Sequence, residues 1–497
     1  LCICAKGHIS GGRRIMLVMN PPPSVAAEVP AEAIPALPLP DVNRDPTAET
    51  AQVVGPPVAP WRTMLRSPLD SLLTRQITRP MTFVQQNNLR TFWHDGIWAS
   101  TSEAFALSFI PLFALAFGAS ASQIGILSAI GNLAGAVALF PGARLLERVG
   151  KRLPIVLWSV GTMYRGPLLL LAILPFLLHD GAVAIPIIVA IMALRAFGLN
   201  LADPSITSLA ADLVPPFMRG RYFSLRNFLM GVATLLITPL AGWIISASAA
   251  ATGRALSGYQ IAFTLAFITG MLATRAYARI VEPPFRDPAA AAAPKAQSIG
   301  QIMRGSRALA AFVVSAFVWN MSLQIAGPYF NVYLVTHLGG TAASVGMVAS
   351  ASALAGLFGQ IFFGRLTDRK GSVWIFLVTG FSITLMPVLW NFYTAPWQVG
   401  INNLFAGFVW AGFTLANFNM LLLLTPDDQR PRAAALYQTA VFTSAVIGPL
   451  IGGYLADNVG YSLVFTASGV GRLLAMLIFA VMGARVAFAH ERKTITV

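Results

Sequence analysis

The chain has 497 residues, of which 56% are hydrophobic and only 11% are charged, and its formal net charge is +15. A soluble domain of this length needs far more charged surface, so the composition excludes an ordinary soluble protein. It indicates a polytopic membrane protein whose surroundings are mostly lipid.

The first 88 residues are predicted to form a cytoplasmic, mostly disordered leader. Residues 20–61 are rich in Pro and Ala and have no hydrophobic periodicity, so they cannot bury a core. Residues 62–80 combine leucines and arginines in the pattern of an interfacial amphipathic helix, with a solvated linker as the equal alternative. Cys2 and Cys4 both lie in this leader, so no cysteine metal site is expected in the membrane core.

From residue 89 to residue 489 the chain divides into about twelve apolar segments, each near the length that a bilayer-spanning helix needs. Helices are expected because lipid offers no partner to backbone groups, and no ten-residue alternating pattern suggests a barrel. The predicted spans are 92–117, 122–141, 153–178, 183–205, 223–247, 259–280, 309–335, 342–363, 372–392, 396–422, 433–455 and 461–487.

Basic residues concentrate on one side of this predicted topology. Of the 34 Lys and Arg residues, all but Arg165, Arg195, Arg254 and Arg472 fall in the leader, the tail, or the loops and adjoining span ends on the side of the two termini. The positive-inside rule therefore predicts cytoplasmic termini. The net charge is explained by this topology and by attraction to anionic lipid, and no basic-aromatic pattern indicates a nucleic-acid partner.

The two halves of the membrane region resemble each other. In chain order, ARLLERVG (143–150) aligns with GRLTDRKG (364–371), LVPPFMRGRYFSL (213–225) with LTPDDQRPRAAAL (424–436), and GYQIAFT (258–264) with GYSLVFT (460–466). Apolar composition alone does not explain charged, Gly and Pro positions that match at ordered offsets. The alignment predicts two homologous bundles of six helices.

This duplication sets the predicted domain boundaries. They are the leader 1–88, an N-terminal bundle 89–280, a cytoplasmic linker 281–307, a C-terminal bundle 308–489 and a cytoplasmic tail 490–497.

The stretch GRLTDRKG fits the pattern G-x-L-x-D-R-x-G, and residues 89–489 resemble the major facilitator superfamily, which carries that pattern in its 2-3 and 8-9 loops. ARLLERVG departs from the pattern at Ala143 and Glu147. The resemblance implies two bundles around a midplane cavity that opens alternately to each side, lined by spans one, four, seven and ten.

The resemblance also implies that these charged loops close the cytoplasmic side when the cavity faces outward. Glycines are expected to allow a tight turn there, and the acid to sit at a helix N-terminus and accept from arginines. The residues predicted for this cytoplasmic gate are Glu147, Arg148, Gly150, Gly364, Asp368, Arg369, Gly371, Arg219 and Arg430.

Ionisable residues inside spans are expected to have a partner or a function, because placing each one at the bilayer centre costs roughly 3 kcal/mol. Glu103 in the first span and Arg195 in the fourth have opposite charges at similar depth, so they are the predicted midplane pair. Arg165, Asp203 and Asp95 are further candidates. A carboxylate that pairs with arginine in one state and is protonated in another couples transport to protons, and a permanent structural ion pair is the alternative.

The C-terminal half is predicted to present a neutral cavity surface, because the repeat aligns Asn320 with Glu103 and Ala406 with Arg195. Amides and one tryptophan recur on helical faces of spans seven and ten, which suits a substrate with an apolar body and a few polar groups. These candidates are Asn320, Gln324, Asn331, Asn403, Trp410 and Asn417. Hydrogen bonding between helices is the alternative for each amide.

GPLIGG (448–453) in span eleven resembles the Gly-Pro motif that drug-proton antiporters of the superfamily carry in span five, which favours efflux although the motif lies in the other half. Close packing of helices through small residues is the alternative explanation. No phosphate loop occurs, and the histidines of the membrane region are scattered at span ends, so neither an ATP-driven pump nor an intramembrane enzyme is expected.

We therefore predict a monomeric secondary transporter of the plasma membrane that exports a small amphipathic solute against protons, with no cofactor or metal. The alternatives are an importer of a sugar or other polar metabolite, and a non-transporting receptor or scaffold with the same fold.

Overall fold

The computed structural model of the chain describes residues 82–284, 307–425 and 430–495. The predicted interfacial helix at 62–80 and most of the predicted leader and linker lie outside the described residues. The described part contains helices and their connections and no strand, which confirms the all-α fold class. Its helices belong to one compact unit.

The N-terminal half has six helical segments, of which the first and third are interrupted. They are α2 (Phe83–Ala106) with α3 (Ile110–Ala116), α4 (Ala121–Val149), α5 (Arg152–Trp158) with the π-helix η2 (Ser159–Arg165) and α6 (Gly166–Leu177), α7 (Gly181–Leu213), η3 (Pro216–Met218) with α8 (Arg219–Thr252), and α9 (Ser257–Tyr277).

The C-terminal half repeats this plan and adds one short helix. Its segments are α11 (Arg307–Ala326) with α12 (Tyr329–Thr336), α13 (Ala342–Lys370), α14 (Ser372–Leu389) with η5 (Trp390–Phe392), α15 (Pro396–Leu424), α16 (Arg430–Asn458), α17 (Tyr461–Met482) and α18 (Ala484–Ile495). Eleven segments of the described chain are long and apolar enough to cross a membrane. The 21-residue α9 holds the place of the sixth span, so the twelve-helix plan is confirmed.

Packing within the halves repeats as the sequence alignment predicts. Helix α4 packs on α7 as α13 packs on α15, and α2 packs on α8 and α9 as α11 packs on α16 and α17. The first segment of each half also breaks beside a proline, Pro111 or Pro328. Proline lacks the N–H that an unbroken helix needs, so the sequence of each half encodes the break in its first segment.

The two charged repeat stretches are helical, which corrects the predicted ends of spans two and eight. Helices α4 and α13 continue to Val149 and Lys370, well beyond the predicted ends at residues 141 and 363. They stop at Gly150 (φ 63°) and Gly371 (φ 85°), where the backbone enters the region that favours glycine. A helix can continue beyond its apolar stretch because its charged side chains are solvated by water outside the hydrocarbon core. We call the side with these two turns the basic end, and the other side the far end.

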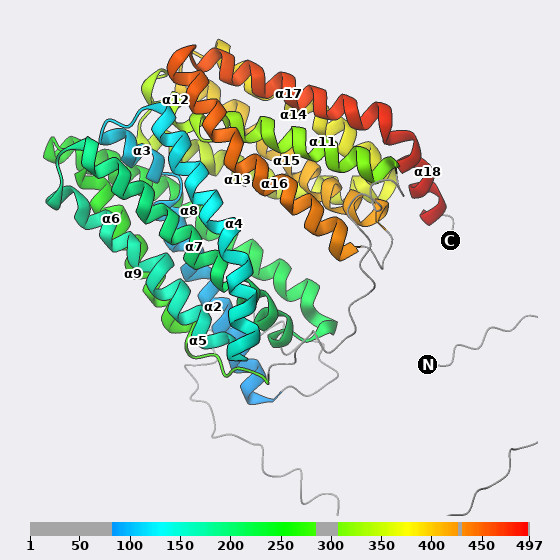
Figure 1. Cartoon of the computed structure of the whole chain (residues 1–497), viewed down its shortest axis with the longest axis horizontal. Coiled ribbons are helices and arrows are strands. Elements are labelled where there is room, and N and C mark those ends of the chain that lie inside the picture. Colours follow the sequence, from blue (N-terminus) through cyan, green and yellow to red (C-terminus); the bar gives the residue numbers. More distant parts are fainter. Residues whose placement is uncertain (1–81, 285–306, 426–429, 496–497) are drawn as a thin grey trace, which may run out of the picture. The chain divides into compact units, whose positions relative to one another are not determined.

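The two halves contact each other through α4 with α16 and α8 with α13 (Figure 1). Asn132 Nδ2 donates to the Ala445 carbonyl at 2.9 Å, and Ser350 Oγ donates to the Leu235 carbonyl at 2.8 Å. Further hydrogen bonds between the described residues of the two halves lie nearer the far end.

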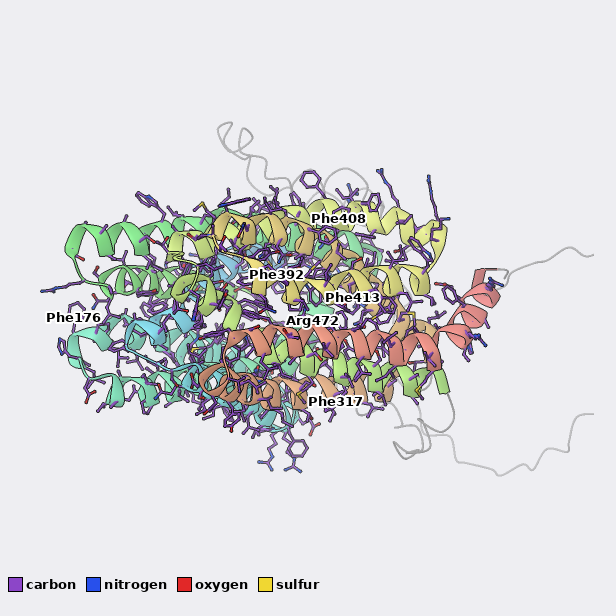
Figure 2. The ribbon with its side chains drawn as sticks, turned by 90° about the horizontal axis from the view of Figure 1, so that it is seen from above. Phe176, Phe317, Phe392, Phe408, Phe413 and Arg472 are labelled. Carbon is purple, nitrogen blue, oxygen red and sulfur yellow. The ribbon has the colours of Figure 1, made fainter. Side chains whose placement is uncertain are left out.

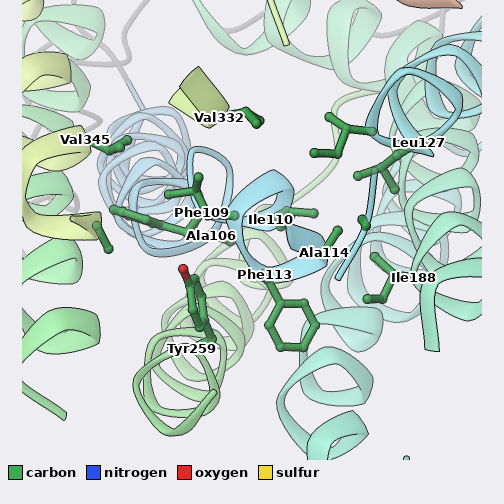
Figure 3. Close-up of a cluster of buried hydrophobic side chains, with 14 of the residues drawn as sticks. Ala106, Phe109, Ile110, Phe113, Ala114, Leu127, Ile188, Tyr259, Val332 and Val345 are labelled. Carbon is green, nitrogen blue, oxygen red and sulfur yellow. The ribbon is translucent and has the colours of Figure 1, made fainter. Parts of the chain in front are cut away.

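A large apolar cluster also joins the halves at the far end (Figure 3). Phe109, Ile110 and Leu127 of the N-terminal half belong to one buried cluster with Val332 and Val345 of the C-terminal half. Burial of this apolar surface favours contact between the halves at the far end.

Toward the basic end α4 and α16 separate. A groove of about 620 Å³ opens between α4 and α16 just beyond the Asn132 contact, with Leu133, Ala136 and Leu139 on one wall. Phe442 and Val446 lie on the opposite wall. The structure is therefore closed at the far end and separated at the basic end.

Candidate functional site

A cavity of about 810 Å³ lies in the N-terminal half, between α2, α5, η2, α7, α8 and α9. Its lining is mainly apolar and aromatic, with a few hydroxyl groups. Five charged side chains also line it, namely Asp95, Glu103, Arg165, Arg219 and Arg226. An apolar cavity with a few convergent polar groups is the usual form of a small-molecule site.

The predicted midplane pair is brought together on the wall of this cavity. Arg195 Nη2 lies 3.1 Å from Glu103 Oε1 and 3.2 Å from Glu103 Oε2. Arg195 is 2% exposed, whereas the Glu103 side chain is 25% exposed, so the carboxylate faces the cavity and the guanidinium lies behind it. Nε and Nη1 of Arg195 have no acceptor in the described part of the chain. The pair is thus a single end-on contact, which protonation of Glu103 would weaken.

Tyr164 belongs to the same group, although it was not among the predicted site residues. The Arg195 guanidinium lies over the Tyr164 ring, 4.5 Å from its centroid, a cation-π distance. Tyr164 and Arg165 are neighbours in the chain and both reach the cavity. They sit at the end of the π-helix η2, a rare element that often occurs at functional sites. The glycine of α7 opposite, Gly198, would place a Cβ only 2.5 Å from Met163 Cβ, so glycine is required for this packing.

Asp95 forms a second group, nearer the basic end of α2. Arg165 Nη2 lies 3.6 Å from Asp95 Oδ1, and Arg226 Nη2 lies 3.4 Å from Asp95 Oδ2. Arg165 also donates to Thr274 Oγ1. Asp203, the other candidate acid, is exposed and makes no ion pair with a described residue.

Arg226 was not predicted as a site residue either, because it was counted among the basic residues on the side of the termini. Helix α8 begins at Arg219, four residues before the predicted start of the fifth span, so Arg226 lies two turns inside it. Its guanidinium stacks on the Phe92 ring at 4.2 Å, and Nε donates to the Phe92 carbonyl at 3.2 Å. A proximity of this kind between spans one and five leaves no local pattern in the sequence.

The six candidate residues of the C-terminal half lie outside the lining of the 810 Å³ cavity. Asn320 and Asn403 donate to carbonyls of their own helices, those of Ala316 and Val399. Asn417 donates to the Tyr437 hydroxyl at 2.9 Å, a bond between α15 and α16 of the kind that the alternative interpretation expects. Gln324, Asn331 and Trp410 are half-buried, and Trp410 packs on Trp319 and Phe413.

The predicted gate residues occupy the last turns of α4 and α13. Glu147, Arg148, Asp368 and Arg369 are exposed there and form no ion pair with any residue that the structure describes. Arg219 donates to the Ala211 and Val214 carbonyls of its own half. The Arg430 side chain lies outside the described residues. Whether these residues act as a gate stays a prediction.

Two expectations about the charged stretches are wrong in detail. Gly364 lies inside α13 and makes no turn, and the acids of the repeat lie at helix C-termini. Other carboxylates take the helix N-termini. Glu282, after α9, accepts from the amides of Arg152 at 2.7 Å and Leu153 at 3.2 Å.

The C-terminal half has the matching arrangement, because Glu491 accepts from the Ser372 and Val373 amides. Each half thus closes on itself at the basic end through an acid that follows its sixth helix. Such an acid is stabilised by the positive end of the helix dipole.

The comparisons with known proteins agree on the fold. A family model described as Major Facilitator Superfamily matches residues 97–336 and 313–495. The multi-drug resistance efflux pump PmrA of Streptococcus pneumoniae is 24% identical over 395 residues, covering 78% of this chain and 93% of that protein. The probable galactarate/D-glucarate transporter GudP of Escherichia coli is 24% identical over 384 residues, covering 69% and 80%.

Solved structures are similar in the same way. A bacterial homologue of the iron transporter ferroportin, in an inward-facing state, gives a TM-score of 0.63 at 16% identity, covering 81% of this chain and 99% of that one. The D-xylose-proton symporter gives a TM-score of 0.61 at 15% identity, covering 80% and 97%. At these identities the likeness shows the fold alone.

Proposed function

Because this chain belongs to the Major Facilitator Superfamily, we propose that it is a proton-coupled secondary transporter that exports a small amphipathic solute by alternating access. The observation that carries the proposal is the Glu103–Arg195 contact on the wall of an 810 Å³ cavity. In this proposal Glu103 is the coupling residue, and Tyr164 holds the guanidinium in place behind it.

Alternating access is supported by the unequal contacts between the halves. Hydrogen bonds and the shared apolar cluster gather toward the far end, while α4 and α16 separate toward the basic end. Thirty of the 34 basic residues fall on the side of the two termini in the predicted topology, so we assign the basic end to the cytoplasm. In this proposal the structure corresponds to an inward-facing state, and the transporter works as a monomer in the plasma membrane.

Proton coupling would follow from the placement of the Glu103 carboxylate. In this proposal Arg195 holds the Glu103 carboxylate in the inward-facing state, and a proton that reaches the carboxylate through the cavity removes the attraction. The released Arg195 is then an uncompensated buried cation, which costs several kcal/mol unless the surrounding helices rearrange. Protonation would therefore favour the change of state.

Export of an amphipathic compound is supported by the mainly apolar lining of the cavity and by the function that the efflux-pump relative is named for. Import of an anionic polar metabolite is the second candidate. It is favoured by Arg165, Arg219 and Arg226, which outnumber the two acids on the cavity wall, and by the name of the sugar-acid relative.

Flux through purified protein tests the proposal. Proteoliposomes with an imposed pH gradient would be given a lipophilic cation dye in one experiment and glucarate in another. Gradient-dependent movement of the dye, abolished by a protonophore, is the expected result. Movement of glucarate alone would support the second candidate, and no protein-dependent movement of either compound would contradict the efflux proposal.

A further inference from the structure

Arg472 lies near the middle of α17 (Figure 2). Its guanidinium is buried and has no carboxylate partner in the described chain. Arg472 is 3% exposed, and its Nε has no acceptor there. Of the four arginines buried in the described chain, Arg152, Arg165 and Arg195 each contact a carboxylate, and Arg472 contacts none. Burying an unpaired cation at this depth is energetically unfavourable, so a negatively charged partner is expected.

Each described carboxylate of the C-terminal half either accepts hydrogen bonds from backbone amides or is exposed, and none pairs with Arg472. Asp457 accepts from backbone amides at the start of α4, and Glu491 accepts from amides at the start of α14. Asp368 is exposed in the last turn of α13. None of these three lies near the middle of α17, so the described chain itself supplies no counter-charge there.

A second unsatisfied donor lies at the same level of the neighbouring helix. Ser315 Oγ donates to the Ala475 carbonyl at 2.7 Å, and Ser468 Oγ donates to the Ser322 carbonyl at 2.6 Å, which fixes the antiparallel register of α11 and α17. Trp319 lies midway between Ser315 and Ser322 on the same stripe, at the level of Arg472. The Trp319 indole N–H is buried and also has no acceptor among the described residues.

The internal repeat independently predicts that these two residues lie side by side. By the offsets of the repeat, Trp319 corresponds to Ser102 and Arg472 corresponds to Gly270. A Cβ on Gly270 would lie 3.0 Å from Ser102 Oγ and 3.2 Å from the Arg165 side chain. In the N-terminal half this location therefore holds the aliphatic part of the Arg165 side chain, whose guanidinium is neutralised by Asp95. The C-terminal half has the guanidinium and lacks the acid, because Phe312 aligns with Asp95.

We propose that Arg472 and Trp319 form an anion-binding site within the C-terminal bundle, which takes a small anionic group. Two buried donors and one positive charge without an acceptor fit chloride or a carboxylate. A void of about 10 Å³ adjoins Trp319 and Met476, and Met476 lies one turn from Arg472. The void has room for about one water and is not lined by Arg472, so neighbouring side chains must shift when an anion binds. The site goes beyond the proposed function, and its occupancy can be measured without any transport.

Thermal unfolding of the full-length protein in nanodiscs tests the site. Sodium chloride and sodium acetate would each be titrated against sodium methanesulfonate at fixed ionic strength. We expect a saturable rise in Tm of about 5 °C for wild type with at least one of the two anions. The rise should be lost in Arg472→Met and reduced in Trp319→Phe, which keeps an aromatic ring and removes the N–H. Arg254→Met, which removes an exposed arginine, should respond as wild type does.

The two anions separate the sources of the ligand. A response to chloride alone indicates an inorganic anion site, and a response to acetate alone indicates a site for the carboxylate of a larger solute. Without either anion, Arg472→Met should unfold at a higher temperature than wild type, since it removes an unpaired buried charge. Equal responses of wild type and Arg472→Met to both anions, or no response of wild type to either, would overturn the proposal.

Discussion

Asp457, near the end of α16, holds the start of α4 by accepting hydrogen bonds from the backbone amides of Ala121 at 3.0 Å and Ser122 at 2.8 Å. The carboxylate of one half thereby caps a helix of the other half at the far end. This arrangement satisfies two amides that α4 itself cannot satisfy, and it places a negative charge at the positive end of a helix dipole. Closure of the far end should therefore depend on Asp457.

Asp457→Ala should weaken that closure. Loss of a capping carboxylate costs about 1 kcal/mol, which shifts a two-state population roughly fivefold. The measurement is labelling of a single cysteine, introduced by Ser108→Cys in a background without Cys2 and Cys4, because Ser108 lines the cavity. A membrane-impermeant reagent added outside should label Asp457→Ala about five times faster than its parent. Unchanged labelling would show that the contact does not stabilise closure.

Gly346→Ala should open the far end in the same way, by steric conflict. A Cβ at Gly346 would lie 2.7 Å from the Thr238 carbonyl of the other half, so α8 and α13 could not approach as closely. Overpacking of this size costs about 1–3 kcal/mol. Gly131→Ala is the matched control, since a Cβ there meets nothing within 4 Å. Faster external labelling should appear in the first variant only, and equal labelling of the two would contradict the assignment.

Asp95→Asn should destabilise the N-terminal half. The substitution leaves Arg165 and Arg226 without their shared counter-charge, and a broken buried ion pair costs about 3–5 kcal/mol. Thermal unfolding should show a lower Tm than for wild type. Adding Arg226→Met to Asp95→Asn should restore part of the loss, because it removes one uncompensated charge. If Asp95→Asn unfolds at the wild-type temperature, the three residues do not form a coupled group.

Glu282→Ala should loosen the basic end of the N-terminal half. Glu282 accepts from two amides at the start of α5 and lies 3.1 Å from Arg152 Nε. Arg152 is completely buried, so loss of this partner should lower the free energy of unfolding by about 2 kcal/mol. Asp180→Asn serves as the control, because asparagine replaces aspartate well at a helix start. Hydrogen exchange in α5 should rise in Glu282→Ala, and exchange that stays at the wild-type level would contradict the capping role.

The twelve spans and the contact between Glu103 and Arg195 were predictable for one reason. An apolar environment restricts charged residues to positions with a partner, so two opposite charges at similar depth are expected to meet. The same restriction fixes the number of spans, because each needs a long apolar stretch. The depth of a residue in the membrane follows from its position within its own span. It can therefore be predicted without knowing which helices are neighbours.

The rest of the site depends on neighbours and on irregular backbone. Tyr164 reaches the Arg195 guanidinium at the end of a π-helix, and no sequence pattern here distinguishes that helix from an α-helix. Arg226 meets Asp95 because α8 packs on α2, which the sequence does not encode locally. The amides of the C-terminal half were assigned to a shared cavity by helical periodicity. Periodicity identifies a face, and in this structure the Asn417 side chain bonds to Tyr437 of α16, outside the cavity lining.

The most direct test of the coupling role of the Glu103–Arg195 pair is transport by Glu103→Gln in proteoliposomes. Asp180→Asn is the control. If Glu103 carries the coupling proton, Glu103→Gln should still exchange substrate between equal concentrations. It should no longer move substrate in response to a pH gradient, since glutamine cannot change its protonation. Substrate accumulation in Glu103→Gln that follows the imposed pH gradient as in wild type would contradict the role of the pair in coupling.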